Sequence, residues 1–202
     1  IKEPSMPWGV EGLLGVLFYC EVSDMMKGAS VSLRTDITLA DVDRMIGWMG
    51  NPNVTRFLNE DPQIVHFLDQ LRTNVPEPML NYHFNRLGRF LLVCTPQGQS
   101  IGFVKLTPAR QGCYEIVYVI GDESLWGRGL GTAAVRAAQS RAFLEWGAEE
   151  LTAKVAPRNS RSVRGLASCG FRQRGINGKY AQFSLTSQEY LQQLFQQRQK
   201  RA

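Results

Sequence analysis

The feature that most constrains this chain is a glycine-rich turn that joins a predicted strand to a predicted helix. The turn, residues 125–132, reads LWGRGLGT. An apolar run over residues 114–120 precedes it, and a helical pattern that ends near Trp146 comes after it. Gly129 and Gly131 can adopt φ values that other residues avoid and let a ligand approach the backbone. Because backbone N–H groups and the positive end of a helix dipole meet at such a turn, we expect it to bind an anion, in the first instance a phosphate.

The glycine spacing alone leaves the kind of site open. A Gly-x-Gly-x-Gly turn also occurs where a helix only has to pack closely on a strand. No Gly-Lys-Ser/Thr ending follows, so this is not a nucleoside-triphosphate loop. The later glycine of a dinucleotide fingerprint is missing, and the preceding strand comes after a predicted hairpin instead of opening a βαβ unit. The spacing therefore excludes two nucleotide-binding loops without choosing among other anions.

The remaining periodicities predict strands and helices on both sides of this turn. Apolar runs and alternation predict strands over residues 30–34, 89–94, 101–106, 113–120, 151–155 and 179–185, with one more entered at Gly170-Phe171. Helical spacing predicts helices from Asp36 or Thr38 to Met49, from Pro62 to the stops at Pro76 and Pro78, after the glycine turn, after Asn159, and over residues 188–200. Residues 53–61 are predicted to be a loop, and Asn177-Gly178 predicts a hairpin. This order indicates an α+β fold with helices around a mixed, largely antiparallel sheet.

Composition narrows the class of ligand. The 202 residues carry a net charge of +5, which fits an anionic ligand without arguing for nucleic acid. Four cysteines without metal or redox spacing, and two histidines, predict no metal site and reduced thiols in a cytoplasmic protein. No apolar run reaches the ~20 residues that span a bilayer, so no membrane partner is expected. We expect residues 1–27 to be an N-terminal extension of uncertain role and residues 28–202 to form one domain.

Two segments together carry a more specific signature. Residues 126–131 occupy an Arg/Gln-x-x-Gly-x-Gly/Ala pattern with Trp126 in place of the usual Gln or Arg, and residues 159–171 read Asn-x-x-Ser-x-Arg-x-Leu-x-x-x-Gly-Phe. With the strand at 114–120, they resemble the GCN5-related N-acetyltransferases (GNAT superfamily), closest to the ribosomal-protein-alanine (RimJ/RimL-like) branch. The resemblance implies the GNAT fold, a mostly antiparallel central sheet with a splayed strand flanked by helices. It also implies an acyltransferase that moves an acetyl group from acetyl-CoA, its co-substrate, to a primary amine by direct transfer in a ternary complex.

The resemblance assigns roles in binding coenzyme A to the turn and its neighbours. Backbone N–H groups of the turn would hold the pyrophosphate, the edge of the central strand would pair with the pantetheine arm, and two residues of the second signature would contact that arm. The residues concerned are Tyr118, Val119, Ile120, Trp126, Gly127, Arg128, Gly129, Leu130, Gly131, Thr132, Asn159 and Ser162. Simpler alternatives stay open, because Asn159 can be a plain helix cap, Ser162 can satisfy only the first helical turn, and Arg128 can be solvated.

Acetyl transfer needs a base for the amine, a donor to polarise the carbonyl oxygen and an exit for the thiolate. Glu115 is the candidate base, although it can equally be a carboxylate with a cross-strand partner. A backbone N–H near Val119 or Ile120 would polarise the carbonyl. Many family members have a Tyr where this chain has Leu166, and Leu cannot protonate the leaving thiolate. The general acid is therefore unassigned, with Ser124 and Tyr118 as distant candidates, and neither Cys113 nor Cys169 has a nearby His for nucleophilic catalysis.

The resemblance implies that the acceptor site is built by the first helices, the loop between them and the late hairpin. We therefore predict a site formed by Trp48, Phe57, Glu60 and Tyr180, although Trp48 and Phe57 can instead pack the helix pair and Glu60 can start a helix. The acceptor is predicted to be a protein N-terminus or a small amine. Leu166 and the lack of a dense acidic cluster leave a non-catalytic acyl-CoA-binding or regulatory module as the alternative. A homodimer through strands or the terminal helix is common in such folds.

Overall fold

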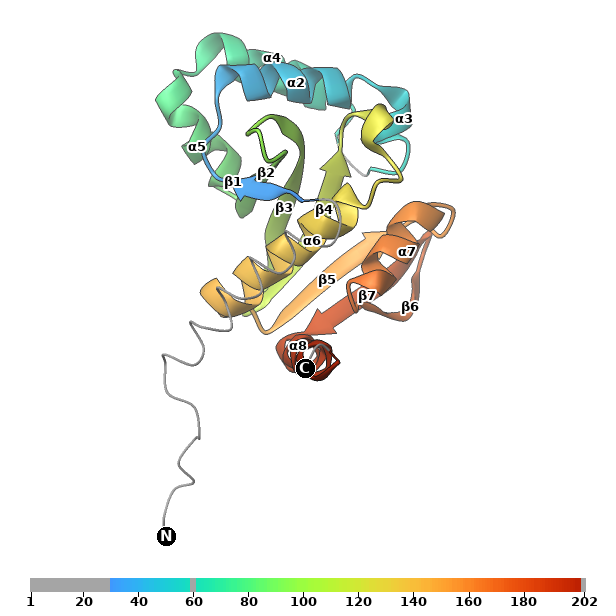
Figure 1. The fold of residues 1–202 in the computed structure, drawn as a ribbon. Helices are drawn as coiled ribbons and strands as arrows, with labels where there is room; N and C mark the ends of the chain where they lie inside the picture. The colour runs from blue at the N-terminus through green and yellow to red at the C-terminus, as the bar shows by residue number, and fades with distance from the viewer. Residues whose placement is uncertain (1–29, 59–60, 201–202) are drawn as a thin grey trace.

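The computed structural model describes residues 30–58 and 61–200. Its sheet has seven strands in the order β1-β2-β3-β4-β5-β7-β6, and Figure 1 shows α2, α4 and α5 gathered at its first half and α7 beside the last three strands. The strands are β1 Ser32–Arg34, β2 Arg89–Cys94, β3 Ser100–Arg110, β4 Cys113–Ile120, β5 Glu150–Val155, β6 Arg172–Asn177 and β7 Tyr180–Thr186. The helices are α2 Leu39–Met49, α3 Pro52–Thr55, α4 Ile64–Asn74, α5 Glu77–Asn85, η1 Glu123–Leu125, α6 Leu130–Ser140, η2 Arg141–Glu145, α7 Ser160–Ser168 and α8 Ser187–Gln199.

The sheet is mostly antiparallel, and its one parallel pair is short. β4 and β5 pair in parallel only over three positions, from Cys113↔Glu150 to Glu115↔Thr152. β4 continues to Ile120 against β3, and β5 continues to Val155 against β7. The two central strands therefore separate beyond Glu115, which confirms the predicted α+β fold with a splayed strand.

Alternating side chains build a separate core on each face of the sheet. In β2, Leu91 and Val93 join the core that contains Val135 of α6 and Leu166 of α7. Phe90 and Leu92 of the same strand join the other core, which contains residues of α2, α4 and α5. Burying apolar side chains on both faces is the main stabilising contribution in such a layered fold. In β4 the same alternation directs Ile116 and Tyr118 toward α6 and α7, and Val119 toward α2.

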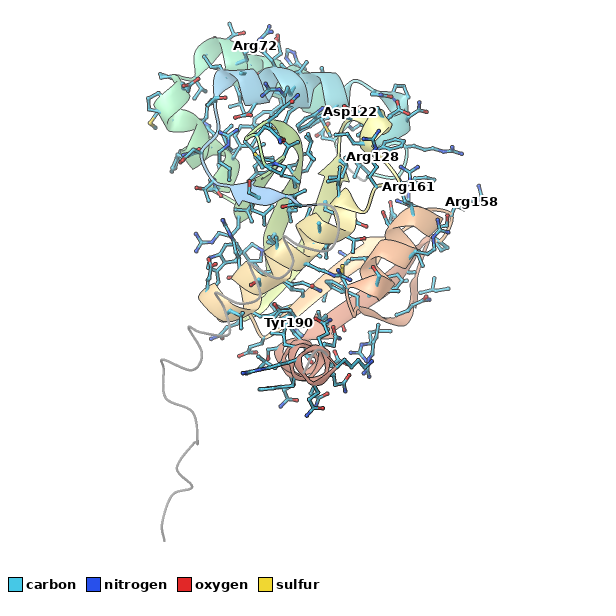
Figure 2. All side chains as sticks on the ribbon, in the orientation of Figure 1. Arg72, Asp122, Arg128, Arg158, Arg161 and Tyr190 are labelled. Atoms are coloured by element: carbon cyan, nitrogen blue, oxygen red, sulfur yellow. The ribbon has the colours of Figure 1, made fainter. Side chains whose placement is uncertain are left out.

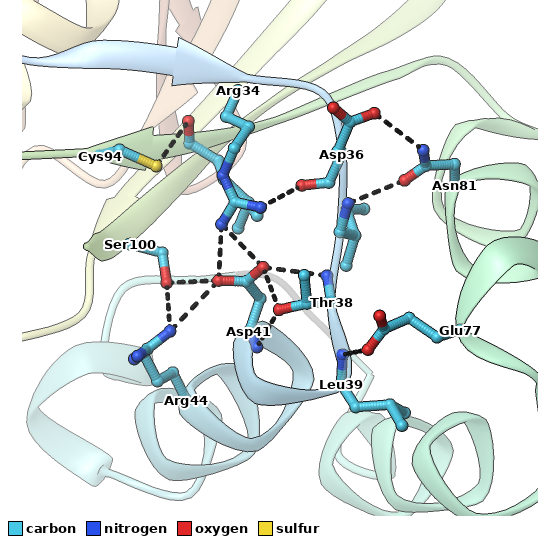
Figure 3. Close-up of polar contacts among 12 residues, drawn as sticks. Arg34, Asp36, Thr38, Leu39, Asp41, Arg44, Glu77, Asn81, Cys94 and Ser100 are labelled. Carbon is cyan, nitrogen blue, oxygen red and sulfur yellow. Dashed lines mark hydrogen bonds and ion pairs between the residues drawn. The ribbon is translucent and has the colours of Figure 1, made fainter. Parts of the chain in front are cut away.

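A buried carboxylate joins β1, α2 and β3 (Figure 3). Asp41 is fully buried, and its side chain accepts hydrogen bonds from Arg34 at 2.8 and 2.9 Å and from Ser100 at 2.7 Å. It also completes a capping box with Thr38, the N-cap of α2. Burial alone would raise the pKa of Asp41, but the hydrogen bonds from Ser100, Thr38 and Arg34 outweigh it, so the pKa lies below its ordinary value of 3.8.

Two helical segments differ from the prediction. Pro76 and Pro78 do end α4, but α5 begins at once, because Pro78 sits in its first turn, where a missing N–H is harmless. The segment predicted as a loop begins with the short α3, which is capped by Asn51. The predicted extension over residues 1–27, and Glu60, lie outside the described residues. None of the described helices is both long and apolar enough to cross a membrane.

Candidate functional site

The glycine turn connects β4 to α6 through the short η1. Gly127 and Gly129 have φ values of +77° and +80°, and Gly129 is the N-cap of α6. These two positions require glycine, because other L-residues rarely adopt this left-handed conformation. The expectation of unusual φ was wrong for Gly131, which is helical. A Cβ at Gly131 would lie 3.1 Å from the Tyr118 ring, so close packing is what favours glycine there.

The turn presents backbone donors at the start of α6. The N–H of Ala133 donates to the carbonyl of Gly129 at 3.0 Å, so the amides of Leu130, Gly131 and Thr132 lie in the first turn, where helical N–H groups lack intrahelical partners. Arg128 is exposed beside them. This arrangement fits an anionic group, since donors, dipole and a guanidinium act together.

Trp126 ties the turn to β4 and to α7. Its Nε1–H donates to the carbonyl of Ile120 at 2.7 Å. The guanidinium of Arg161, in the first turn of α7, lies over its ring at 4.1 Å from the centroid, and Figure 2 shows Arg161 and Arg128 near this junction. This contact is a cation–π interaction. The tryptophan that replaces the usual Gln or Arg therefore connects the end of β4 with the start of α7, across the gap between β4 and β5.

The backbone of β4 offers donors to the gap between the strands. Gly121 N–H donates to Ile101 of β3, so by alternation the N–H of Val119 also faces β3. The N–H groups of Tyr118 and Ile120 then face away from β3, toward the gap. Of the two backbone positions predicted to polarise a carbonyl, Ile120 is therefore the one directed at the gap.

A cavity of about 500 Å³ passes between the separated strands and reaches both faces of the sheet. On the face of α6 and α7 it is lined by Tyr118, Leu166, Asn159 and Ser162, among others. On the opposite face it is lined by Lys105, Thr107, Glu115, Lys154 and Tyr180, with Phe57 and Leu58 from the segment after α3. The cavity is therefore lined both by residues predicted to bind coenzyme A, namely Tyr118, Asn159 and Ser162, and by residues predicted to bind the acceptor, namely Phe57 and Tyr180.

Some predicted acceptor residues lie elsewhere. Trp48 is not part of the described cavity lining. Its ring packs on Gly121, where a Cβ would lie 2.1 Å from a ring atom, so its role here is packing at the end of β4. Glu60 is outside the described residues. Phe57 and Tyr180 remain candidates, because both line the cavity.

The start of α7 faces this cavity. Asn159 caps the helix, with its Oδ1 accepting the N–H of Ser162 at 3.2 Å. The amide nitrogen of Asn159 keeps two N–H donors that can serve a ligand. The hydroxyl of Tyr118 lies near Ser162, and a Cβ at Gly165 would lie 3.0 Å from it. Burial raises the pKa of Tyr118, which the nearby Ser162 side chain only partly opposes, so the hydroxyl stays protonated at neutral pH.

The candidate base Glu115 pairs with a residue on the neighbouring strand, which was the alternative role considered for it from the sequence. Its Oε2 lies 2.5 Å from Nζ of Lys154, and both side chains face the cavity on the α2 side of the sheet. Sequence reasoning did not include Lys154 or Lys105 in the site. A signal was present, since each is the one charged residue of a predicted strand, Lys105 in residues 101–106 and Lys154 in residues 151–155.

Other candidates for proton transfer or covalent chemistry are less well placed. Ser124 donates its hydroxyl to Asp122 at 2.7 Å on the exposed η1 segment, away from the cavity lining. Leu166 is fully buried.

Burial raises the pKa of Cys169 to about 11, so it is a neutral thiol near pH 7. No three metal-ligating side chains of the described residues lie together.

Comparisons with known proteins agree on one family. The family model of the acetyltransferase (GNAT) domain matches residues 32–172. An uncharacterized N-acetyltransferase p20 from Bacillus licheniformis is 26% identical over 166 residues, which cover 75% of this chain and 90% of that protein. A spermidine N-acetyltransferase from Vibrio cholerae, solved with CoA and spermine, has a TM-score of 0.65 and 22% identity, covering 80% of this chain and 98% of the other. The aminoglycoside acetyltransferase AAC(6')-Ib, solved with coenzyme A, has a TM-score of 0.66 and 20% identity, covering 81% and 98%.

Proposed function

This chain belongs to the GNAT acetyltransferase family and is an acetyl-CoA-dependent N-acetyltransferase, and we propose that it acetylates a protein N-terminus or a small amine by direct transfer in a ternary complex. The observation that carries this proposal is the cavity through the splayed sheet. It has residues of α7 on one face and Glu115 on the other. A donor and an acceptor that enter from opposite faces can therefore meet without a covalent enzyme intermediate.

The donor would lie along the gap edge of β4. First-turn amides of α6 hold the phosphates, and Arg128 adds a charged contact. The N–H groups of Tyr118 and Ile120 line the path of the arm, with Ile120 at the carbonyl oxygen. The carbonyl oxygen of Ile120 already accepts a hydrogen bond from the Trp126 side chain. The edge of β4 therefore offers the pantetheine arm fewer hydrogen-bond acceptors than a fully open strand edge would.

The chain's residues then have to move two protons. The amine nitrogen bonds to the carbonyl carbon and loses a proton to Glu115, directly or through water, as the carbon–sulfur bond breaks. The leaving thiolate takes a proton from the Tyr118 hydroxyl, which recovers one from solvent by way of Ser162. We assign this role to Tyr118 because it is protonated, lines the cavity and lies beside the α7 segment that carries Leu166.

Within the family, we place the chain nearest the RimJ/RimL-like branch, on the basis of Trp126 and Leu166. This placement favours a protein N-terminus as acceptor. The two solved relatives named for spermidine and for aminoglycosides are less than 25% identical to the chain. Their likeness supports a shared fold, not a shared acceptor.

A thiol-release assay tests the proposal. The purified chain is incubated with acetyl-CoA and panels of peptides and small amines, and free thiol and acetylated product are both quantified. Release that depends on the amine, with equimolar product, is expected. Acetyl-CoA binding without amine-dependent release from any acceptor would overturn the catalytic proposal in favour of a binding module.

A further inference from the structure

Lys105 lines the cavity and has no ionic partner in the part of the chain that the structure describes. It is on β3, opposite Val117 of β4, and it is partly buried on the cavity wall. Among residues 30–58 and 61–200, no carboxylate lies within ion-pairing distance of its ammonium. Holding a charged group partly out of water without a partner is unfavourable unless something else compensates it.

The other described residues of the cavity wall do not supply that compensation. Glu115 is the one carboxylate among the described lining residues, and it already pairs with Lys154. The described wall carries two lysines and one glutamate, so the described part of the lining has a net charge of +1. A bound anionic group would satisfy Lys105, whereas a second ammonium would be repelled by it.

This charge pattern also suits the amine itself. A neighbouring ammonium lowers the pKa of a bound amine, because it disfavours a second positive charge in the same space. The acceptor must be neutral to attack a thioester carbonyl. Lys105 would therefore hold the acceptor by its anionic group and at the same time favour the reactive form of its amine.

We propose that Lys105 selects an acceptor in which a carboxylate lies within a few bonds of the primary amine. This inference rests on the proposed function and narrows its acceptor class. The shared chemistry occurs in a free α-amino acid and in a peptide N-terminus with an acidic second residue. Polycationic amines are disfavoured by the same pattern.

The test uses the full chain with acetyl-CoA and matched acceptors. Glutamate is compared with its diamide. A peptide that has Asp as its second residue is compared with the same peptide that has Asn there. Spermidine serves as the polycation. Each is measured by thiol release with Lys105→Met, Lys105→Glu and, as a control at the exposed end of α8, Lys200→Met. The comparison of glutamate with the Asp peptide shows whether the site accepts a free amino acid, a peptide N-terminus or both.

We expect carboxylate-bearing acceptors to exceed their amides in kcat/KM by about ten- to a hundredfold, the worth of one charge-assisted hydrogen bond. Lys105→Met removes this preference and Lys105→Glu reverses it, with KM for acetyl-CoA unchanged, while Lys200→Met retains it. High salt reduces the preference. Equal turnover of both members of each pair, or a preference that survives Lys105→Met, would overturn the inference and leave the proposed acetyltransferase function intact. Absence of turnover with every amine would instead contradict the proposed function.

Discussion

The proposed donor site and the proposed acceptor site of this chain are built in different ways. The proposed donor site relies on backbone groups of one continuous stretch, in which Gly127 and Gly129 set the conformation and the first turn of α6 presents its amides. The acceptor side uses side chains that come from β3, β4, β5 and β7, with Phe57 from the segment after α3. The donor side therefore depends on local conformation, and the acceptor side depends on strand register.

This difference explains why a family can keep its donor while it changes its acceptor. A substitution on the acceptor face alters charge or shape without moving the backbone of the turn. Replacing a glycine in the turn instead changes the conformation that every donor contact needs. Disrupting each side separately tests this division.

The largest effect is expected from Gly129→Glu. It forces a side chain into a left-handed conformation and places a carboxylate beside the anion site, so acetyl-CoA affinity should fall about a thousandfold or more. Gly129→Ala introduces the backbone strain without the carboxylate, so its acetyl-CoA affinity shows how much of the loss comes from strain alone. Gly47→Ala is the control, since Gly47 lies on α2 and a Cβ added there would have no atom within 4 Å. Calorimetric affinity that stays unchanged in Gly129→Glu would refute the anion-site assignment.

Asp41→Asn should destabilise the acceptor-side scaffold. It leaves Arg34 and Ser100 without their buried carboxylate, and the expected loss is about 3 kcal/mol in urea unfolding. Asp43→Asn, which touches only a surface pair with Arg72, should change stability by less than about 0.5 kcal/mol.

The same carboxylate predicts a pH dependence. The pKa of Asp41 is lower in the folded protein than its ordinary value of 3.8. Its contribution to stability is therefore complete above about pH 4 and is lost as the pH falls through the lower folded value. Wild-type stability should decrease below about pH 4 more steeply than that of Asp41→Asn. Parallel curves for the two proteins would show that Asp41 is not responsible.

Glu115→Gln tests the base while it keeps the side-chain shape. We expect kcat to fall about a hundredfold, as for loss of a general base, with acetyl-CoA affinity unchanged. Lys154→Met is the matched variant, because it removes the ion pair and leaves the carboxylate. If both variants lose the same activity, the ion pair and not proton transfer is what matters.

Tyr118→Phe should have the smallest effect, about a tenfold fall in kcat, because a thiolate can also leave into water. The ring keeps its packing against Gly131, so stability and acetyl-CoA affinity should be retained. The pH profile of kcat should lose a basic limb. An unchanged profile and rate would remove Tyr118 from the mechanism.

The sequence predicted the elements that local signals define. Thr38 caps α2, Asn159 caps α7 and the Asn177-Gly178 turn joins β6 to β7, as their residue types indicate. It missed α5, because a proline can open a helix as well as end one, and the residues after the proline decide between the two. It placed Trp48 in the acceptor site, whereas tertiary packing puts that ring on Gly121.

By itself the sequence determined the strand-turn-helix order of the proposed donor site and the cap of α7, since these are properties of neighbouring residues. Only the tertiary structure decided that Gly131 packs on Tyr118 and which side chains line the proposed acceptor side. Glu115 and Lys154 are far apart in the chain and meet because β4 and β5 pair at one register before they separate. Lys105 comes from a third strand, and strand register leaves it without a carboxylate partner among residues 30–58 and 61–200. Long-range strand pairing fixes which side chains share a cavity, and no local signal carries that information.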